Sequence, residues 1–300
     1  MAYVISTVNM KGGVGKTTLT VNVAACLAKY YGKRVLVLDL DSQISATLSL
    51  MAPHDFAKTR RRRRTISNLI DAIVNPHPNK RYDINDMVCH RICDIEGFEL
   101  LPGDIELYDE YLVSEMLHKQ SLEYPDADFS LVWNGLERIL IDSILEPVKD
   151  NYDYILMDCA PGYNLLTRSG IAASDYYLLP ARPEPLSIVG IQLLERRIAK
   201  LKETYAHCRP VNINLLGIVF IQSANGLMGR YFKQVMRRVE RDFTLEQRFQ
   251  NSIPMDINVA KAVDLFMPAA LAAPNSAGSR AFIKLTEEIV HRLGSERMSA

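Results

Sequence analysis

Short apolar runs alternate with longer amphipathic stretches along this chain. Stretches with helical spacing include 17–31, 131–148 and 188–205. Strands that are apolar on both faces and alternate with helices are typical of a parallel sheet covered on both sides. The pattern therefore predicts an α/β fold with a doubly wound, mostly parallel sheet flanked by helices. The runs that predict its strands are 3–8, 34–40, 98–101, 154–157, 176–179 and 215–221.

The domain organisation follows from the spacing of these elements. We find no internal repeat and no long linker, so we expect residues 1–300 to form a single domain. The least regular stretch lies around 52–95, and we expect it to be a loop-rich insertion at the surface. It contains a basic run, Arg60 to Arg64, which could contact DNA or could be an exposed linker.

Composition places the chain among soluble globular proteins, with 48% hydrophobic and 23% charged residues. The 35 basic and 35 acidic residues cancel, so any binding of DNA must come from a local patch. We see neither a membrane-spanning run nor a secretory leader. Five cysteines, an odd number, favour reduced thiols. We therefore expect a cytoplasmic protein.

A glycine-rich stretch lies between the first predicted strand and the first predicted helix. Its glycines allow backbone N–H groups to turn toward one centre, and the helix N-terminus adds a partial positive charge. We expect Lys16 to neutralise the β- and γ-phosphates of a nucleotide, and the Thr17 hydroxyl to ligate Mg²⁺. The stretch predicts a P-loop NTPase fold, and the residues expected to bind the phosphates are Lys11, Gly12, Gly13, Val14, Gly15, Lys16, Thr17 and Thr18.

The phosphate stretch departs from the common P-loop pattern at its start. Met10 stands where that pattern has a glycine, and a second lysine, Lys11, follows it. In this respect the stretch resembles the deviant Walker A motif of the ParA/MinD family of ATPases. The resemblance implies that Lys11 reaches the nucleotide of the opposite protomer in a homodimer formed with ATP. It also implies ATP hydrolysis, with Lys11 and Lys16 acting at the reacting phosphates.

Two further acidic motifs follow predicted strands. The stretch 35–43 resembles the second motif of the family, which implies that Asp41 orients the attacking water and that Asp39 belongs to the magnesium shell. The stretch 155–162 has the pattern of a Walker B motif, with Asp158 as a further Mg²⁺ partner. Because ligands bind at the carboxyl ends of strands in open parallel sheets, we expect these acids to lie near the γ-phosphate.

The resemblance extends over nearly the whole chain. The stretch 179–187 is similar to the family segment that follows a central strand, and 253–254 and 259–294 are similar to its closing region. On this resemblance Pro254 is a candidate neighbour of the adenine. The guanine motif Asn-Lys-x-Asp does not occur in the sequence, which favours ATP over GTP.

Within this family three classes of function compete. The first is a ParA-type ATPase, which binds DNA non-specifically as an ATP dimer and positions or segregates a cargo such as a plasmid, a chromosome or a protein assembly. A cargo-adaptor protein would stimulate hydrolysis and release it, so the protein would be nucleoid-associated when bound to ATP. The alternatives are a MinD-like membrane-associated switch and a metabolic enzyme on the same scaffold.

One helical stretch favours the first class. At about 100° per residue, its basic residues gather on one side, with Arg238 at the edge, and its apolar residues gather on the other. Such a basic face could contact DNA phosphates, or it could simply be solvated. With the family resemblance we predict a DNA-binding surface, formed by Arg230, Lys233, Arg237, Arg238 and Arg241.

The alternatives receive less support from the sequence. The last predicted helix, 281–293, has the apolar pattern of a core element, and the residues after it offer little to insert into a membrane. We therefore expect no membrane binding. An iron-sulfur cluster shared between protomers would need more thiols near the nucleotide than Cys159 alone.

Overall fold

The computed structural model describes residues 2–75, 83–107, 118, 122, 129–221, 237–239 and 241–299. One sheet of six parallel strands lies at its centre, in the order β3-β2-β4-β1-β5-β6. The doubly wound α/β fold predicted from the sequence is confirmed. The strands are β1 (Tyr3–Thr7), β2 (Val35–Leu40), β3 (Phe98–Leu101), β4 (Tyr154–Cys159), β5 (Tyr176–Ala181) and β6 (Asn214–Phe220).

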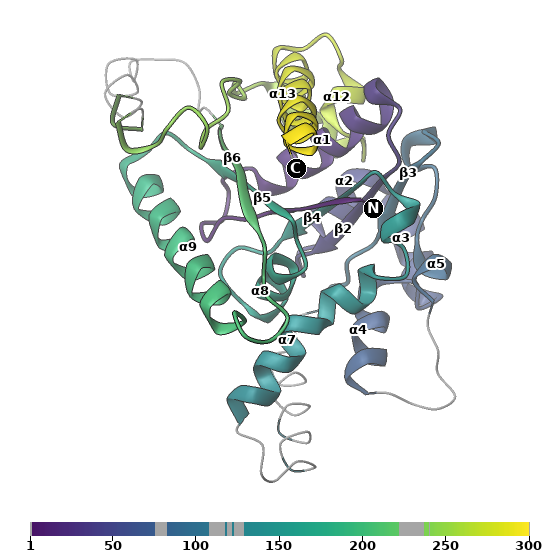
Figure 1. Cartoon of the computed structure of the whole chain (residues 1–300). Coiled ribbons are helices and arrows are strands. Elements are labelled where there is room, and N and C mark those ends of the chain that lie inside the picture. The colour runs from purple at the N-terminus through teal and green to yellow at the C-terminus, as the bar shows by residue number, and fades with distance from the viewer. Residues whose placement is uncertain are drawn as a thin grey trace.

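Helices cover both faces of the sheet (Figure 1). Alternation along β2 sends Leu36 and Leu38 into one core and Val35 and Val37 into the other. The first core is completed by α7 (Phe129–Leu145), α8 (Leu165–Ala172) and α9 (Pro185–Thr204). The second is completed by α1 (Lys16–Tyr31), α12 (Ala269–Ala272) and α13 (Ala277–Ser299).

The ends of two helices bear on the sequence predictions. Gly32 closes α1 in the left-handed conformation, with φ 59°, as a glycine at that position predicts. The last helix, α13, is longer than the expected 281–293 and continues past Gly294. A glycine inside a helix costs only about 1 kcal/mol relative to alanine, so it does not have to end the helix.

The stretch around 52–95 differs from the loop-rich insertion that we expected. Its described residues form short helices, because Pro53 opens one of them and Phe56, Ile66 and Leu69 bury apolar side chains under them. These elements follow α2 (Ser45–Leu50) and comprise α3 (Pro53–Arg61), α4 (Ile66–Val74), α5 (Ile84–Met87) and η1 (Ile92–Asp94). The remaining short helices of the described chain are η2 (Lys149–Asn151) and α11 (Ile257–Asp264).

The basic run is anchored at both of its ends. The Nε atom of Arg60 lies 3.1 Å from a carboxylate oxygen of Asp104, which is buried. Arg64 donates to the main-chain oxygen of Val88 at 3.0 Å. The run therefore continues from the last turn of α3 into a held turn and is not a free linker.

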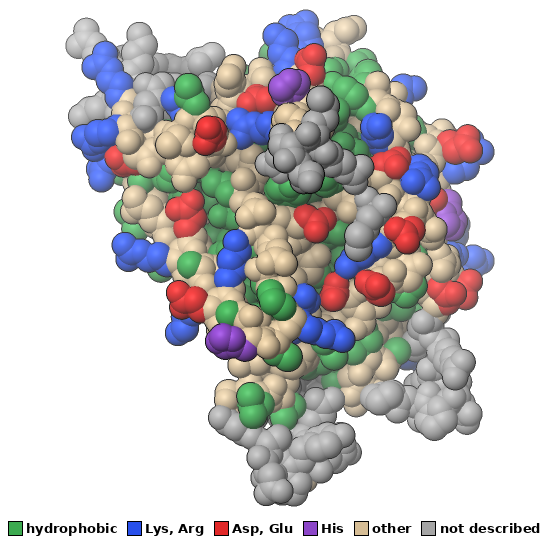
Figure 2. Space-filling view, in the orientation of Figure 1, with side chains coloured by type: hydrophobic (Ala, Val, Ile, Leu, Met, Phe, Trp, Pro, Cys, Tyr) green, Lys and Arg blue, Asp and Glu red, His purple; other side chains and the backbone are tan. Residues whose placement is uncertain are grey.

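The surface shows acidic and basic side chains interspersed over much of the face drawn in Figure 2, in keeping with the zero net charge. Several basic side chains lie at the upper left of this view. Among the residues that the structure describes, no helix is both long and apolar enough to cross a membrane.

Candidate nucleotide-binding site

The glycine-rich loop joins the end of β1 to the start of α1, as predicted. Gly13 and Gly15 have φ of 69° and 89°, a region that side chains other than glycine enter at a cost. A Cβ atom on Gly15 would lie 2.5 Å from the Cδ1 atom of Ile221, at the end of β6. The loop is thus a preformed turn whose backbone passes close to the Ile221 side chain, just beyond β6.

Lys16 lies at the base of this loop, with a side chain that is almost fully buried. Its Nζ atom donates to the main-chain oxygen of Lys11 at 3.2 Å. Burial lowers the pKa of Lys16, and the negative charges of Asp158 and Asp41 oppose that shift. The charges of these two acids thus favour the protonated form of Lys16.

The other lysine of the motif turns away from the loop. The Nζ atom of Lys11 lies 2.8 Å from Oε2 of Glu184, which precedes α9. Their side chains are 50% and 37% exposed. Lys11 is thus accessible at the surface beside the loop, where a second molecule can reach it.

Asp158 is the last residue but one of β4 and faces the first turn of α1. The Thr17 hydroxyl donates to its Oδ2 atom at 2.6 Å. Asp39 lies directly opposite Asp158 in the paired strand β2. Burial raises the pKa of Asp158, and the charge of Asp39 raises it further. These two acids therefore lie side by side near the carboxyl ends of their strands, and their place beside a γ-phosphate stays a prediction.

This pairing of carboxylates fits a divalent cation. Two buried acids side by side repel each other, and a cation beside them would relieve that repulsion. Within the described part of the chain, no group of three or more His, Cys, Asp or Glu side chains could hold a metal ion unaided. Mg²⁺ characteristically takes one or two protein ligands and completes its shell with water and substrate phosphates. Thr17 and Asp158 are suited to that role.

Asp39 makes its contacts inside the chain. Its carboxylate accepts hydrogen bonds from the main-chain N–H and the hydroxyl of Thr47, both at 2.8 Å. It also accepts the N–H of Asp41 at 3.2 Å. Burial raises the pKa of Asp39, and these hydrogen bonds oppose the shift. The role of Asp39 in a magnesium shell stays a prediction.

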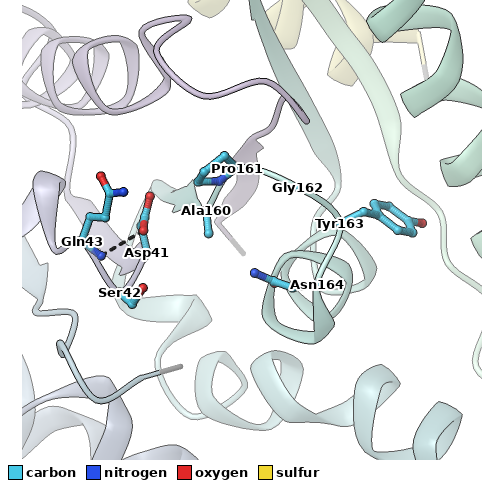
Figure 3. Close-up of a pocket in the computed structure, with 8 residues that line it drawn as sticks. All are labelled: Asp41, Ser42, Gln43, Ala160, Pro161, Gly162, Tyr163 and Asn164. Atoms are coloured by element: carbon cyan, nitrogen blue, oxygen red, sulfur yellow. Dashed lines mark hydrogen bonds between the residues drawn. The ribbon is translucent and has the colours of Figure 1, made fainter. Parts of the chain in front are cut away.

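Asp41 lies just beyond β2 and lines an open cavity of about 430 Å³. The N–H of Gln43 donates to its Oδ1 atom at 3.0 Å. Figure 3 shows Asp41 and Gln43 on one side of this cavity, with Tyr163 and Asn164 of the segment after β4 on the other. The cavity gives Asp41 access to solvent, which a group that orients water requires.

Pro254 lies near the same edge of the sheet. The preceding residue, Ile253, pairs with Ile221 in an isolated parallel bridge. Ile221 is also the residue whose side chain closes over Gly15. The structure thus brings the Pro254 segment beside the phosphate loop, and its contact with adenine stays a prediction.

The predicted DNA-binding residues are placed in part. Arg237, Arg238 and Arg241 are exposed on a helical segment, while Val239 and Phe243 of the same segment are buried. This agrees with the amphipathic pattern of the sequence. Arg238 and Arg241 lie 3.5 and 3.3 Å from carboxylate oxygens of Asp242, which offsets part of their charge. The two other predicted residues, Arg230 and Lys233, lie outside the described residues.

Sequence reasoning missed three residues that shape the site. Glu184 holds Lys11 although 173 positions separate them. Thr47 holds Asp39, and Gly103 donates its N–H to the Thr47 hydroxyl at 2.9 Å. Glu184 lies in the segment 179–187, which the sequence already matches to the family. Its acidic side chain could therefore have been considered as a partner for Lys11. Thr47 and Gly103 belong to no motif in the sequence.

The parallel sheet, the phosphate loop and the acids at the strand ends together define a P-loop nucleoside triphosphatase. A family model described as an AAA domain matches residues 2–209, which is more than half of the chain. The chain belongs to the ParA/MinD family of ATPases.

Relatives align over almost the full chain. An uncharacterised protein of Mycobacterium tuberculosis is 30% identical over 98% of this chain and 80% of its own length. The sporulation initiation inhibitor protein Soj of Bacillus subtilis is 28% identical over 96% of this chain and 98% of its own. The chromosome partitioning protein ParA of Caulobacter vibrioides is 27% identical, with 96% and 94% covered.

Solved structures share the fold. McdA of Cyanothece has a TM-score of 0.70 at 18% identity, covering 97% of this chain and 100% of its own. MinD of Pyrococcus horikoshii, complexed with Mg-ADP, has a TM-score of 0.65 at 22% identity, with 96% of each chain covered. Cobyrinic acid a,c-diamide synthase of Mycobacterium smegmatis, with a bound ATP analogue and magnesium, has a TM-score of 0.72 at 20% identity, covering 99% and 97%.

Proposed function

We propose that this protein is a ParA-type ATPase that binds ATP with Mg²⁺ and hydrolyses it. The observation that carries this proposal is the buried Lys16 at the base of a preformed phosphate loop, beside Thr17, whose hydroxyl donates to Asp158. Bound Mg²⁺ would neutralise phosphate charge. Thr17 and Asp158 would hold it, with Asp39 behind them as the second carboxylate of the shell.

The residues of the chain divide the work of hydrolysis. Backbone N–H groups of residues 11–18 bind the phosphates, and Lys16 balances charge that develops on them. Asp41 accepts a hydrogen bond from the attacking water and orients it toward the γ-phosphate. The open cavity beside Asp41 supplies that water.

We further propose that ATP drives the formation of a homodimer. Lys11 is half exposed beside the loop and can exchange Glu184 for the phosphates of a nucleotide in the second copy. The start of α9 adds an apolar stripe next to this ion pair, formed by Leu186, Val189 and Leu193, which are 76%, 57% and 42% exposed. Burial of this stripe would help to stabilise the dimer.

The ATP dimer would bind DNA without sequence preference. The support is the exposed Arg237, Arg238 and Arg241 on a segment held down by buried Val239 and Phe243. Arg230 and Lys233, which the sequence pattern assigns to the same face, complete the proposed surface. Two copies of a weak basic face in one dimer act together, so affinity rises sharply when the dimer forms. The relatives Soj and ParA agree with this class of function.

Hydrolysis would end DNA binding, and a cargo-adaptor protein would trigger it. Such a cycle positions or segregates a cargo over the nucleoid in the cytoplasm. The fold does not distinguish this class from its alternatives, because MinD and the diamide synthase share it with similar TM-scores of 0.65 and 0.72. The choice rests on the partition relatives and on the basic face.

Binding of fluorescent random-sequence DNA, measured by anisotropy with ATP and with ADP, tests this function. We expect the parent protein to bind in ATP, and to bind unrelated duplexes equally well. Equal and weak binding in both nucleotides would contradict the ParA-type proposal and favour the membrane switch or the metabolic enzyme.

A further inference from the structure

The carboxylate of Asp39 holds both ends of the loop that carries Asp41. Its Oδ1 atom accepts the N–H of Asp41 at 3.2 Å, where the loop leaves β2. Its Oδ2 atom accepts the N–H and the hydroxyl of Thr47, each at 2.8 Å, where the loop has entered α2. Asp39 and Thr47 are both fully buried. The seven-residue loop from Asp41 to Thr47 is therefore clamped across its base.

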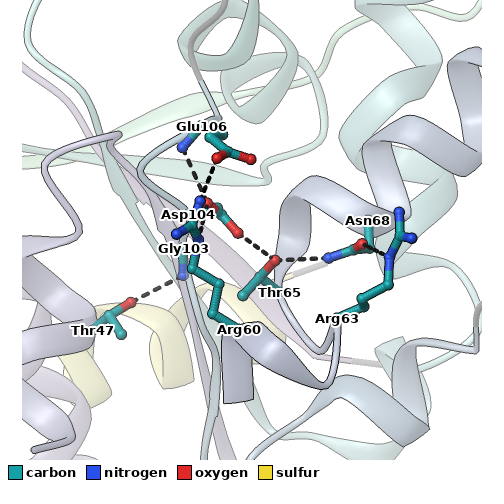
Figure 4. A network of polar contacts seen from close by, with 8 residues as sticks. All are labelled: Thr47, Arg60, Arg63, Thr65, Asn68, Gly103, Asp104 and Glu106. Atoms are coloured by element: carbon teal, nitrogen blue, oxygen red, sulfur yellow. Dashed lines mark hydrogen bonds and ion pairs between the residues drawn. The ribbon is translucent and has the colours of Figure 1, made fainter. Parts of the chain in front are cut away.

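Thr47 is also held by a contact from outside the loop. The N–H of Gly103, in the segment after β3, donates to the Thr47 hydroxyl at 2.9 Å (Figure 4). A Cβ atom on Gly103 would lie 3.1 Å from the Cγ atom of Asp39, which is tighter than ordinary contact. The hydroxyl thus accepts one hydrogen bond and donates another in a space that leaves little room for a side chain at position 103.

The segment behind Thr47 is held in turn by the next residue. Asp104 is buried and accepts the hydroxyl of Thr65 at 2.8 Å and the Nε atom of Arg60 at 3.1 Å. Figure 4 shows these contacts gathered on the side of Gly103 away from Thr47. Because a hydrogen-bonded buried carboxylate is costly to displace, this segment is a firm support for Thr47.

The clamped loop contains a strained residue. Ile44 has φ 49° and ψ 31°, a left-handed conformation that is rare for a β-branched side chain, and it is buried. Such a conformation is strained, and it persists where the surroundings determine it. The loop would therefore relax to another backbone path if the clamp at its base were lost.

We propose that Thr47 is a positioning residue for ATP hydrolysis. Through Asp39 it fixes the strained loop so that Asp41 stays where it orients water, and Gly103 supplies the second contact that holds the threonine. This inference rests on the proposed role of Asp41. Since a misplacement of about 1 Å can cost about 10²-fold in rate, loss of the Thr47 hydroxyl should act on turnover far more than on ATP binding.

The test compares Thr47→Val with Thr47→Ser. Valine keeps the shape but removes the hydroxyl, which leaves the Gly103 N–H unpaired and takes one donor from Asp39. We expect Thr47→Val to lower kcat at least about tenfold, with the Kd for a fluorescent ATP analogue changed less than about twofold. Thr47→Ser should restore kcat, because it returns the hydroxyl. Phosphate release at saturating Mg-ATP and analogue titration are the two measurements.

A matched control is Thr286→Val, which removes a fully buried hydroxyl that donates to the main-chain oxygen of Phe282 at 2.8 Å within α13, outside this network. It should also lose stability but keep the parental kcat. Gly103→Ala is a second variant should Thr47→Val not fold, and it should also lower kcat. Parental kcat in Thr47→Val or in Gly103→Ala, or an equal loss in Thr286→Val, would overturn the inference.

The same assay separates this inference from the proposed function. If Asp41→Ala hydrolyses ATP at the parental rate, the role of Asp41 fails and the positioning role fails with it. If Asp41→Ala is inactive and Thr47→Val is fully active, Asp41 keeps its role and the inference about Thr47 alone is wrong.

Discussion

Lys11 pairs with Glu184 at 2.8 Å, outside the phosphate loop of which it is the first residue. Lys16, five positions later, points inward and donates to the main-chain oxygen of Lys11 at 3.2 Å. Two lysines of one motif therefore face different environments, one at the surface and one buried at the base of the loop. Their substitutions should have different consequences.

The first prediction is that these two lysines contribute unequally to ATP binding. Lys16→Ala should weaken ATP binding by about tenfold or more, because it removes a charge that is close to the phosphates in a buried setting. Lys11→Ala should change the affinity of the monomer less than about threefold, since an exposed ion pair contributes about 0–1 kcal/mol. Titration of a fluorescent ATP analogue measures both. Lys33→Ala is a control for the loss of one positive charge. If Lys11→Ala and Lys16→Ala lost equal affinity for the ATP analogue, the prediction that the two lysines contribute differently would be wrong.

The second prediction concerns chemistry. Asp41→Ala should retain ATP but hydrolyse it about 10²- to 10⁴-fold more slowly, because it removes the group that orients water and leaves the loop that binds phosphate. Single-turnover phosphate release measures the rate. Asp55→Ala, at an exposed acid on α3, serves as the control. If Asp41→Ala hydrolyses ATP at the parental rate, another acid must orient the attacking water.

The sequence predicts most of the fold because strands buried on both faces have a direct signature. All six apolar runs became strands of the parallel sheet, with ends that differ by one or two residues. The phosphate loop was predictable as well, since its turn demands glycine at Gly13 and Gly15 and its position between strand and helix is fixed. Both signals are local in the sequence.

The contacts that hold the site could not be predicted in the same way. Gly103 meets Thr47 because β3 pairs with β2, and that pairing is a property of the sheet order. The insertion was expected to be loop-rich because arginines and prolines mark it, yet buried Phe56 and Ile66 turn much of it into helices. In both cases tertiary packing decided the outcome, so the residues concerned carry no local pattern.

The third prediction tests the basic face. Arg237→Glu with Arg241→Glu should lower affinity for unrelated duplexes about equally and flatten the dependence of binding on salt, since fewer counterions are released. ATP binding should be unchanged. Salt titrations of DNA anisotropy in ATP measure the slope. Lys261→Glu with Lys284→Glu changes the net charge equally at two exposed lysines elsewhere, and this control should keep the parental slope.

The fourth prediction concerns pH and the segment after Pro254. Asp256 caps α11, and the N–H groups of Gly278 and Asn258 donate to it, both at 2.8 Å. These bonds, that of Gly278 foremost, lower the pKa of Asp256 from 3.8 to about 2. Because the folded pKa is depressed, this stabilisation is present above about pH 4 and is lost as the pH falls toward 2.

The measurement for this fourth prediction is urea denaturation across that pH range. Asp256→Ala should lower the free energy of unfolding by about 1 kcal/mol near neutral pH, and the gap should narrow as the pH falls. Asp256→Asn keeps a capping oxygen but has no carboxylate to titrate. The part of the difference in unfolding free energy that changes with pH should therefore come from the Asp256 carboxylate. A gap that is independent of pH would contradict the assignment.

The central claim is that ATP switches this protein from monomer to dimer. Light scattering on Asp41→Ala, which should hold ATP without consuming it, measures the mass directly with Mg-ATP and with Mg-ADP. The account predicts the mass of two chains in ATP and of one chain in ADP, and one chain in both when Lys11→Ala is added. A mass of one chain for Asp41→Ala in saturating ATP, with ATP shown to be bound, would contradict the claim.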